Sequence, residues 1–188
     1  GANYYPDDLD KDWLEKWIEE HPDQKDELSS FFTVIRYKKP TSYPMAIPYS
    51  TYYEKDLREA ARYLSKASEY ASSTSMEKYL ISRATAFLSN SYRTSDELWV
   101  KLDDPKFDIV IGPYETYEDR LFGYKAAFES FVMVKKPALT AQLDKVRAHM
   151  DAMEQRMPLD KKYRGYERAK ASPKVAADLF YSGGDARV

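Results

Sequence analysis

The chain has 188 residues, with 29 Lys and Arg, 31 Asp and Glu, and a formal net charge of −2. This length suits one domain or a domain with an appendage, and the evenly mixed charges exclude a basic surface for nucleic acid or anionic lipid. No apolar run approaches the roughly 20 residues needed to cross a bilayer, so we expect no membrane span. The sequence begins Gly1-Ala2 without an initiator Met or a signal peptide. We therefore expect the natural start to have been removed, and the compartment, cytoplasmic or exported, stays open.

Side chains that bind transition metals are scarce. The sequence has no Cys, which excludes Cys-ligated zinc within this chain. His21 and His149 are the two His residues, and neither belongs to an H-E-x-x-H motif. Because a catalytic zinc usually takes two or three His ligands, the sequence predicts no metal site in this chain.

A helical hairpin is predicted for residues 1–38. Apolar side chains recur every three or four residues over 7–20 and again over 27–37, which is the spacing of an amphipathic helix. A Pro after the first helix should end it. Residues 38–50 hold three Pro among Tyr and Ser, so we expect an extended connector on the surface.

Residues 39–188 are predicted to form a single α+β unit. Apolar stripes predict long helices over 53–71 and 75–89, and capping-box sequences begin at Thr74 and Thr94. The two long helices should pack antiparallel because a short turn joins them.

A small sheet and one more helix complete this unit. Alternating apolar residues near 107–117, 126–135 and 175–182 predict three strands. From 137 to 157, apolar residues repeat at alternating steps of four and three, which predicts a helix whose stripe fills the core. The predicted fold class is therefore α+β, mostly helical, with amphipathic helices packed on a small sheet. One edge of that sheet should lack a partner strand, which invites a dimer contact.

The polar spacing most typical of a site follows the first of these strands. Glu115, Tyr117 and Asp119 alternate in sequence, so an extended backbone would aim them at one face. There, a carboxylate would suit an amine, and a phenol would donate a hydrogen bond or stack on a ligand. Alternatively, the tyrosine packs while the two acids cap turns or pair with Arg120 or Lys125. The residues alone leave both interpretations open.

The surrounding sequence resembles a known peptidase family. The resemblance lies in Tyr114-Glu115-Thr116-Tyr117-Glu118-Asp119, then Gly123 and Phe128-Glu129-Ser130-Phe131-Val132. These residues are similar to the E-[ST]-Y-x-D…G…F-E-x-F-V block of the dipeptidyl peptidase III family, and the bacterial branch is the most similar. The likeness is strongest over 108–134 and returns over 175–186. Members of that family are zinc-dependent exopeptidases that remove dipeptides from the N-termini of peptides.

The resemblance implies a role for two residues. Glu115 would bind the free N-terminal ammonium of a peptide. Tyr117 would be both substrate-binding and catalytic, because it would donate to the scissile carbonyl as negative charge develops. A carboxylate at a set distance from the metal would count residues from the peptide end. The zinc is expected in the full-length parent, since the family's H-E-x-x-[x]-G-H helix is absent from this sequence.

The missing zinc motif sets the expected function. We expect a partial substrate-side lobe of a two-lobed metallopeptidase, C-terminally truncated relative to the family and inactive alone. One alternative is a non-catalytic binding or scaffold domain that kept the fold. Another is a complete hydrolase using Glu115 with Glu129, for which nothing in the sequence fixes the carboxyl separation. Some bacterial relatives carry a Nudix domain, but its R-E-x-x-E-E signature does not occur in these residues.

Overall fold

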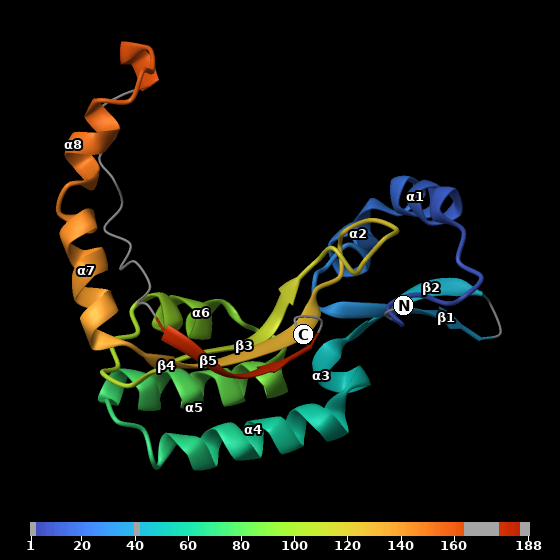
Figure 1. Ribbon diagram of the computed structural model, residues 1–188. Helices are drawn as coiled ribbons and strands as arrows, with labels where there is room; N and C mark the ends of the chain where they lie inside the picture. Colours follow the sequence, from blue (N-terminus) through green and yellow to red (C-terminus); the bar gives the residue numbers. More distant parts are fainter. Residues whose placement is uncertain (1–2, 40–41, 164–176, 185–188) are drawn as a thin grey trace.

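The computed structural model describes residues 3–39, 42–163 and 177–184. Figure 1 shows a sheet in the middle, with α4 (Glu54–Ser68) and α5 (Thr74–Ser89) below it and with α7 (Pro137–Arg147) and α8 (Met150–Gln155) rising from one end. The fold is α+β, as the sequence predicts. In chain order the elements are α1 (Lys11–Glu20), η1 (Pro22–Gln24), α2 (Lys25–Leu28), β1 (Thr33–Lys38), β2 (Tyr43–Pro48), α3 (Tyr49–Tyr52), α4 (Glu54–Ser68), α5 (Thr74–Ser89), α6 (Arg93–Val100), β3 (Phe107–Glu115), β4 (Ala127–Lys135), α7 (Pro137–Arg147), α8 (Met150–Gln155), η2 (Lys161–Tyr163) and β5 (Ala177–Gly183).

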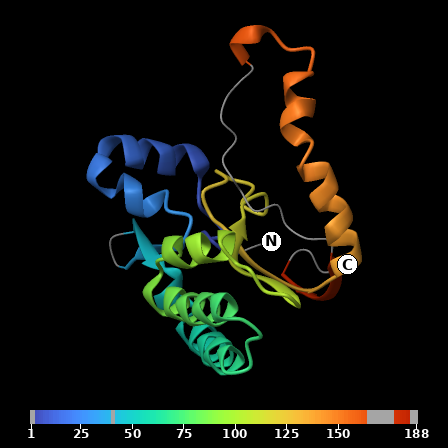
Figure 2. The same ribbon diagram turned by 90° about the vertical axis from the view of Figure 1, so that its left-hand side faces the viewer.

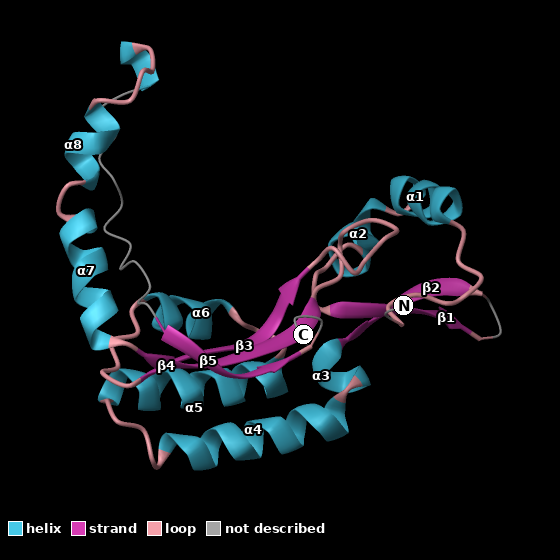
Figure 3. Cartoon of the chain, in the orientation of Figure 1, coloured by secondary structure: helices cyan, strands magenta, loops and turns pink. Residues whose placement is uncertain are grey.

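The described strands form two antiparallel sheets (Figure 3). β1 pairs with β2, and β4 lies between β3 and β5. Near the end of β3, Pro113 lies opposite Phe128 and Glu115 lies opposite Ala127, so the register shifts between Pro113 and Glu115. Such a bulge bends a strand and redirects the side chains that follow it. The chain therefore leaves the regular sheet at the residues that the sequence marks as a site.

The main core lies between this sheet and the helices α4 and α5. The predicted helices over 53–71 and 75–89 are confirmed as α4 and α5, and the three predicted strands are confirmed as β3, β4 and β5. One face of each helix is buried because the apolar residues recur at helical spacing. The buried residues of the core are Tyr4, Val34, Tyr49, Leu57, Ala61, Leu64, Met76, Tyr79, Leu80, Ala84, Ala86, Phe87, Tyr92 and Leu102.

The predicted N-terminal helical hairpin is wrong in its second half. α1 forms, but residues 27–37 hold the end of α2 and then most of the strand β1. Val34 and Ile35 are buried and β-branched, so a strand paired with β2 suits them better than a helix does. The connector predicted over 38–50 supplies β2, whose two Pro residues are tolerated because a two-stranded sheet has unpaired edges.

The helix caps differ from the prediction at α5 and α6. The N-cap of α5 is Ser73 rather than Thr74, and its hydroxyl accepts a hydrogen bond from the Met76 backbone N–H at 3.2 Å. α6 follows Tyr92, and no side chain caps it, so Thr94 lies inside the helix. Both capping-box assignments are therefore wrong, the first by one residue.

The helix predicted over 137–157 is divided and does not fill the core. α7 ends at Arg147 and α8 begins at Met150. Neither helix contains a buried residue among those described. Figure 2 shows both helices extending away from the rest of the protein. The residues of the predicted stripe that are exposed are Leu139, Leu143, Val146, Met153 and Met157. An apolar period predicts a one-sided helix, but it does not by itself supply the surface that covers that side.

β5 stands at one edge of the three-stranded sheet. Within the described ranges, no strand pairs with its outer side. Leu179, Phe180 and Tyr181 on this strand are exposed. A dimer through this edge stays a prediction. Within those ranges, none of the helices combines the length and apolarity needed to cross a bilayer.

Candidate functional site

Glu115 ends β3 with one carboxylate oxygen engaged and one without a partner. The side chain is 8% exposed. Oε1 accepts hydrogen bonds from the backbone N–H groups of Tyr117 and Glu118, the latter at 3.2 Å. Oε2 is buried and has no hydrogen-bonding partner among the described residues. A buried acceptor without a donor is costly, so this oxygen is a candidate for binding an external donor.

Tyr117 lies beyond the strand, in a turn. Its side chain is 67% exposed, whereas Glu115 is buried. The predicted extended backbone across Glu115, Tyr117 and Asp119 is wrong, because β3 ends at Glu115 and the chain then turns. The Asp119 backbone N–H donates to the Thr116 carbonyl at 3.2 Å, which closes this turn. The phenol of Tyr117 therefore projects from a turn that is held by the Glu115 carboxylate.

Asp119 organises the loop that follows. It is 6% exposed. Oδ1 accepts from the backbone N–H groups of Leu121 and Phe122 at 3.1 and 3.2 Å. Oδ2 accepts from the N–H groups of Tyr124 and Lys125, both at 2.9 Å, and from the Tyr5 hydroxyl at 2.6 Å. The interpretation that the two acids cap turns is therefore confirmed for both Glu115 and Asp119.

Lys125 is buried inside this loop. The side chain is 0% exposed. Its Nζ donates to the carbonyls of Leu28 and Ser30 at 2.7 and 2.8 Å and to Thr33 Oγ1 at 2.9 Å. Burial lowers the pKa of this amine to about 7, and the negative charge of Asp119 acts in the opposite direction. Lys125 therefore ties the loop to the segment from Leu28 to Thr33, and its amine does not pair directly with a carboxylate.

A buried arginine, which the sequence pattern does not mark as part of the site, contacts the end of β3. Arg83 of α5 is 0% exposed. Its Nη2 donates to Asp96 Oδ1 at 2.5 Å and also to the Tyr114 hydroxyl, which itself donates to Asp96 at 2.7 Å. Tyr114 directly precedes Glu115, so this triad holds the backbone that carries the acid. The available signal was a charged residue at i+3 from Leu80, on the apolar stripe of the helix.

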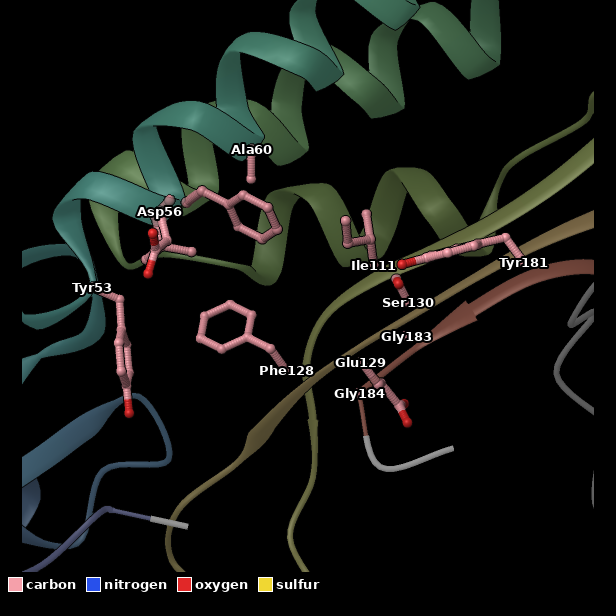
Figure 4. Close-up of a pocket in the computed structure, with 12 residues that line it drawn as sticks. Tyr53, Asp56, Ala60, Ile111, Phe128, Glu129, Ser130, Tyr181, Gly183 and Gly184 are labelled. Atoms are coloured by element: carbon pink, nitrogen blue, oxygen red, sulfur yellow. The ribbon is translucent and has the colours of Figure 1, made fainter. Parts of the chain in front are cut away.

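A cavity of about 400 Å³ lies between α4 and the three-stranded sheet (Figure 4). Tyr53 and Asp56 line it from the helix side, and Ile111 and Phe128 line it from the sheet. Glu129 also borders this cavity, and its pKa is raised by burial and, to a lesser extent, by Glu115. The negative charge of Glu115 therefore acts on the Glu129 carboxyl group.

The described residues do not form a metal site. Within the ranges given above, no three His, Cys, Asp or Glu side chains are grouped closely enough to hold a metal ion. His21 Nδ1 lies 3.0 Å from the Trp17 carbonyl, and its ring stacks on that of Trp17. His149 Nδ1 lies 2.7 Å from the Lys145 carbonyl. Both imidazoles are thus hydrogen-bonded at helix ends, far from Glu115 in sequence.

Comparison with known proteins identifies the chain as peptidase sequence. Residues 35–173 match the sequence model of the family described as Peptidase family M49. The chain belongs to this family. The match includes Glu115, Tyr117, Asp119 and Lys125, but it begins after most of the N-terminal segment that contacts them.

Two solved bacterial structures are similar over nearly all of the chain. Dipeptidyl peptidase III from Caldithrix abyssi has a TM-score of 0.90 and 44% identity over 98% of this chain. Dipeptidyl-peptidase III from Corallococcus sp. strain EGB has a TM-score of 0.84 and 35% identity over 97% of it. This chain spans 35% and 34% of those two chains, respectively.

Two curated proteins are also similar. The Arabidopsis thaliana protein named Nudix hydrolase 3 is 38% identical over 100% of this chain, which spans 27% of that protein. The Mus musculus protein named dipeptidyl peptidase 3 is 26% identical over 56% of this chain, which spans 15% of that protein. The whole-protein activities that these names state therefore come from sequences several times longer.

Proposed function

We propose that this chain supplies the substrate-binding side of a zinc-dependent, dipeptidyl peptidase III-like metallopeptidase. Glu115 binds the N-terminal ammonium of a peptide, and Tyr117 donates a hydrogen bond to the scissile carbonyl. The observation that carries this proposal is the buried Glu115 Oε2, which has no donor among the described residues and lies at the end of β3.

The ammonium of a peptide would complete the hydrogen bonding of Glu115. The turn N–H groups already engage Oε1 and fix the orientation of the carboxylate. A cationic donor on Oε2 would form a charge-assisted hydrogen bond, which is stronger than a neutral one and stronger still away from water. An N-acylated peptide has no such cation, so the site would discriminate in favour of free N-termini.

Tyr117 is suited to act on a peptide held in this way. Its side chain is exposed, and its backbone N–H donates to Glu115 Oε1, so the backbone from which the phenol projects is attached to the acid. A donor fixed before the reaction stabilises a developing oxyanion without reorganisation, which makes such a donor effective.

The zinc that the family implies does not fit the described residues of this chain. We propose that other residues of the whole enzyme bind it, and that this chain alone does not hydrolyse peptides. A non-catalytic binding domain is the competing function. It would bind peptides through Glu115 without turnover in any protein that contains the chain.

The test uses the whole protein that carries this chain. We expect Glu115→Gln to lower kcat/KM for a dipeptidyl arylamide about 100-fold, as expected when a charged partner of a bound cation is lost. The residual activity should not distinguish free from N-acetylated substrate. Glu19→Gln, at an exposed position on α1, is the matched control and should leave both rates unchanged. Retained preference for the free amine in Glu115→Gln would refute the assignment.

A further inference from the structure

We infer that the N-terminal segment is part of the site. The hydroxyl of Tyr5, acting through Asp119, is a positioning group for Tyr117. This inference rests on the proposed function, in which the Tyr117 phenol must be correctly placed to donate to the scissile carbonyl. The segment mostly precedes residues 35–173, which the family model matches.

Tyr5 is the donor to Asp119 that comes from outside the loop. The other four donors are backbone N–H groups between Leu121 and Lys125. The Tyr5 ring also packs against Phe122, with ring centroids 5.7 Å apart. Lys11 of α1 lies 5.3 Å from the centroid of the same Phe122 ring. The N-terminal segment therefore contacts the loop through a hydrogen bond to Asp119 and through packing on Phe122.

The far end of the loop is fixed to the same part of the chain. Lys125 Nζ donates to two carbonyls and a hydroxyl in the segment from Leu28 to Thr33. The backbone N–H of Ala126 donates to the Phe31 carbonyl at 2.9 Å. The loop from 119 to 126 is thus held at both ends by residues that lie more than 90 positions earlier in sequence.

Tyr117 lies between two carboxylates that have different anchors. Glu115 holds the start of its turn from β3, and Asp119 closes the end of the turn through its own N–H to the Thr116 carbonyl. Removal of the Tyr5 hydroxyl would loosen the Asp119 end and leave the Glu115 end intact. The Tyr117 phenol would then be held less precisely, while Glu115 could still bind the ammonium. We therefore expect kcat to fall without a matching rise in KM.

Tyr5→Phe in the whole enzyme tests this inference. The variant keeps the ring that packs on Phe122 and removes the hydroxyl alone. We expect kcat to fall about 10-fold with KM changed less than about twofold, as for an interaction that matters in the transition state. Tyr70→Phe, an exposed tyrosine on the surface, is the matched control and should change neither constant.

A double-mutant cycle with Tyr117→Phe separates positioning from general weakening. If Tyr5 acts through the Tyr117 phenol, Tyr5→Phe should lower kcat no further in the Tyr117→Phe background. Hydrogen exchange should also become faster at the amides of Leu121, Phe122 and Tyr124 in Tyr5→Phe and stay unchanged in α5. That measurement reports the loosening without relying on activity.

Each remaining result contradicts a stated part of the account. An equal loss of kcat in both backgrounds, a rise in KM alone, or no change in kcat would overturn the role of Tyr5 and leave the proposed function standing. A Tyr117→Phe variant with wild-type kcat would overturn the proposed function itself, and the inference about Tyr5 with it.

Discussion

The irregular loop from 116 to 126 contains buried residues, whereas the regular helices α7 and α8, which form an arm, contain none among the described residues. The loop has no regular secondary structure, yet Glu115 at its entrance and Asp119 and Lys125 within it are buried and hydrogen-bonded. The arm is helical and has a clean apolar period, but none of its helical residues in the described part of the chain is buried. Charged groups with several partners can fix an irregular segment more firmly than an apolar stripe that lacks a partner surface.

The largest expected effect is at the organising acid of the loop. Asp119→Ala removes an acceptor of five hydrogen bonds and leaves buried donors unpaired, so we expect a loss of about 3 kcal/mol in the free energy of unfolding. Asp151→Ala on the arm should cost less than about 0.5 kcal/mol, because Asp151 is exposed. Urea unfolding of both variants measures this difference. Equal losses would contradict the prediction that the loop residue contributes more to stability than the arm residue.

The second effect is the pH dependence of the free energy of unfolding that arises from the buried amine of Lys125. Lys125 has its pKa lowered from 10.5 to about 7, so the unfolded chain binds more protons between these values and stability should rise with pH. Compared with Lys125→Met, the wild type should gain about 2 kcal/mol between about pH 8 and about pH 9.5. The loss of stability on acidification is complete once the pH has fallen below about 7, where the amine is protonated in both states.

The matched control for this experiment is Lys145→Met on the exposed face of α7, which should follow the wild-type pH profile. The measurement ends below pH 10 because burial raises the pKa of Tyr4 and Tyr49 above the ordinary value of 10.0. Their stabilising contribution is complete below that pH and declines above it. A flat difference between wild type and Lys125→Met would show that Lys125 keeps its proton throughout.

The smallest expected effect is on the arm. Leu143→Ala should lower the free energy of unfolding by less than about 0.5 kcal/mol, because the side chain is exposed and leaves no cavity. Thermal or urea unfolding of the chain measures it. A loss of about 2 kcal/mol or more would mean that the apolar face of the arm is buried in solution, as the charged residues of the loop are.

Periodicity predicts the parts of this fold that depend on one buried face. It predicts α4, α5 and the three strands, since each of them places apolar residues against a common core. It fails at β1, because the spacing from Leu28 to Ile35 imitates a helix while β-branched Val34 and Ile35 pair with β2. Exposure of the arm could not be predicted, because a stripe does not reveal its partner.

The residues of the candidate site could be named from the sequence, but their geometry could not. Glu115 and Tyr117 carry the family resemblance, yet the turn between them forms because Glu115 Oε1 accepts the backbone N–H groups that follow it. The partners of Lys125 are two carbonyls and a hydroxyl more than 90 positions away, which no local pattern encodes. Long-range polar contacts of this kind become visible only when the chain is folded.

The most direct test of the account is the structure of the whole protein with a bound peptide that has a free N-terminus. We predict that the peptide's N-terminal nitrogen lies within hydrogen-bonding distance of Glu115 Oε2, about 2.7–3.2 Å, with the Tyr117 hydroxyl directed at the second peptide carbonyl. A peptide whose amine is bound elsewhere, or a protein donor already occupying Glu115 Oε2, would contradict the account.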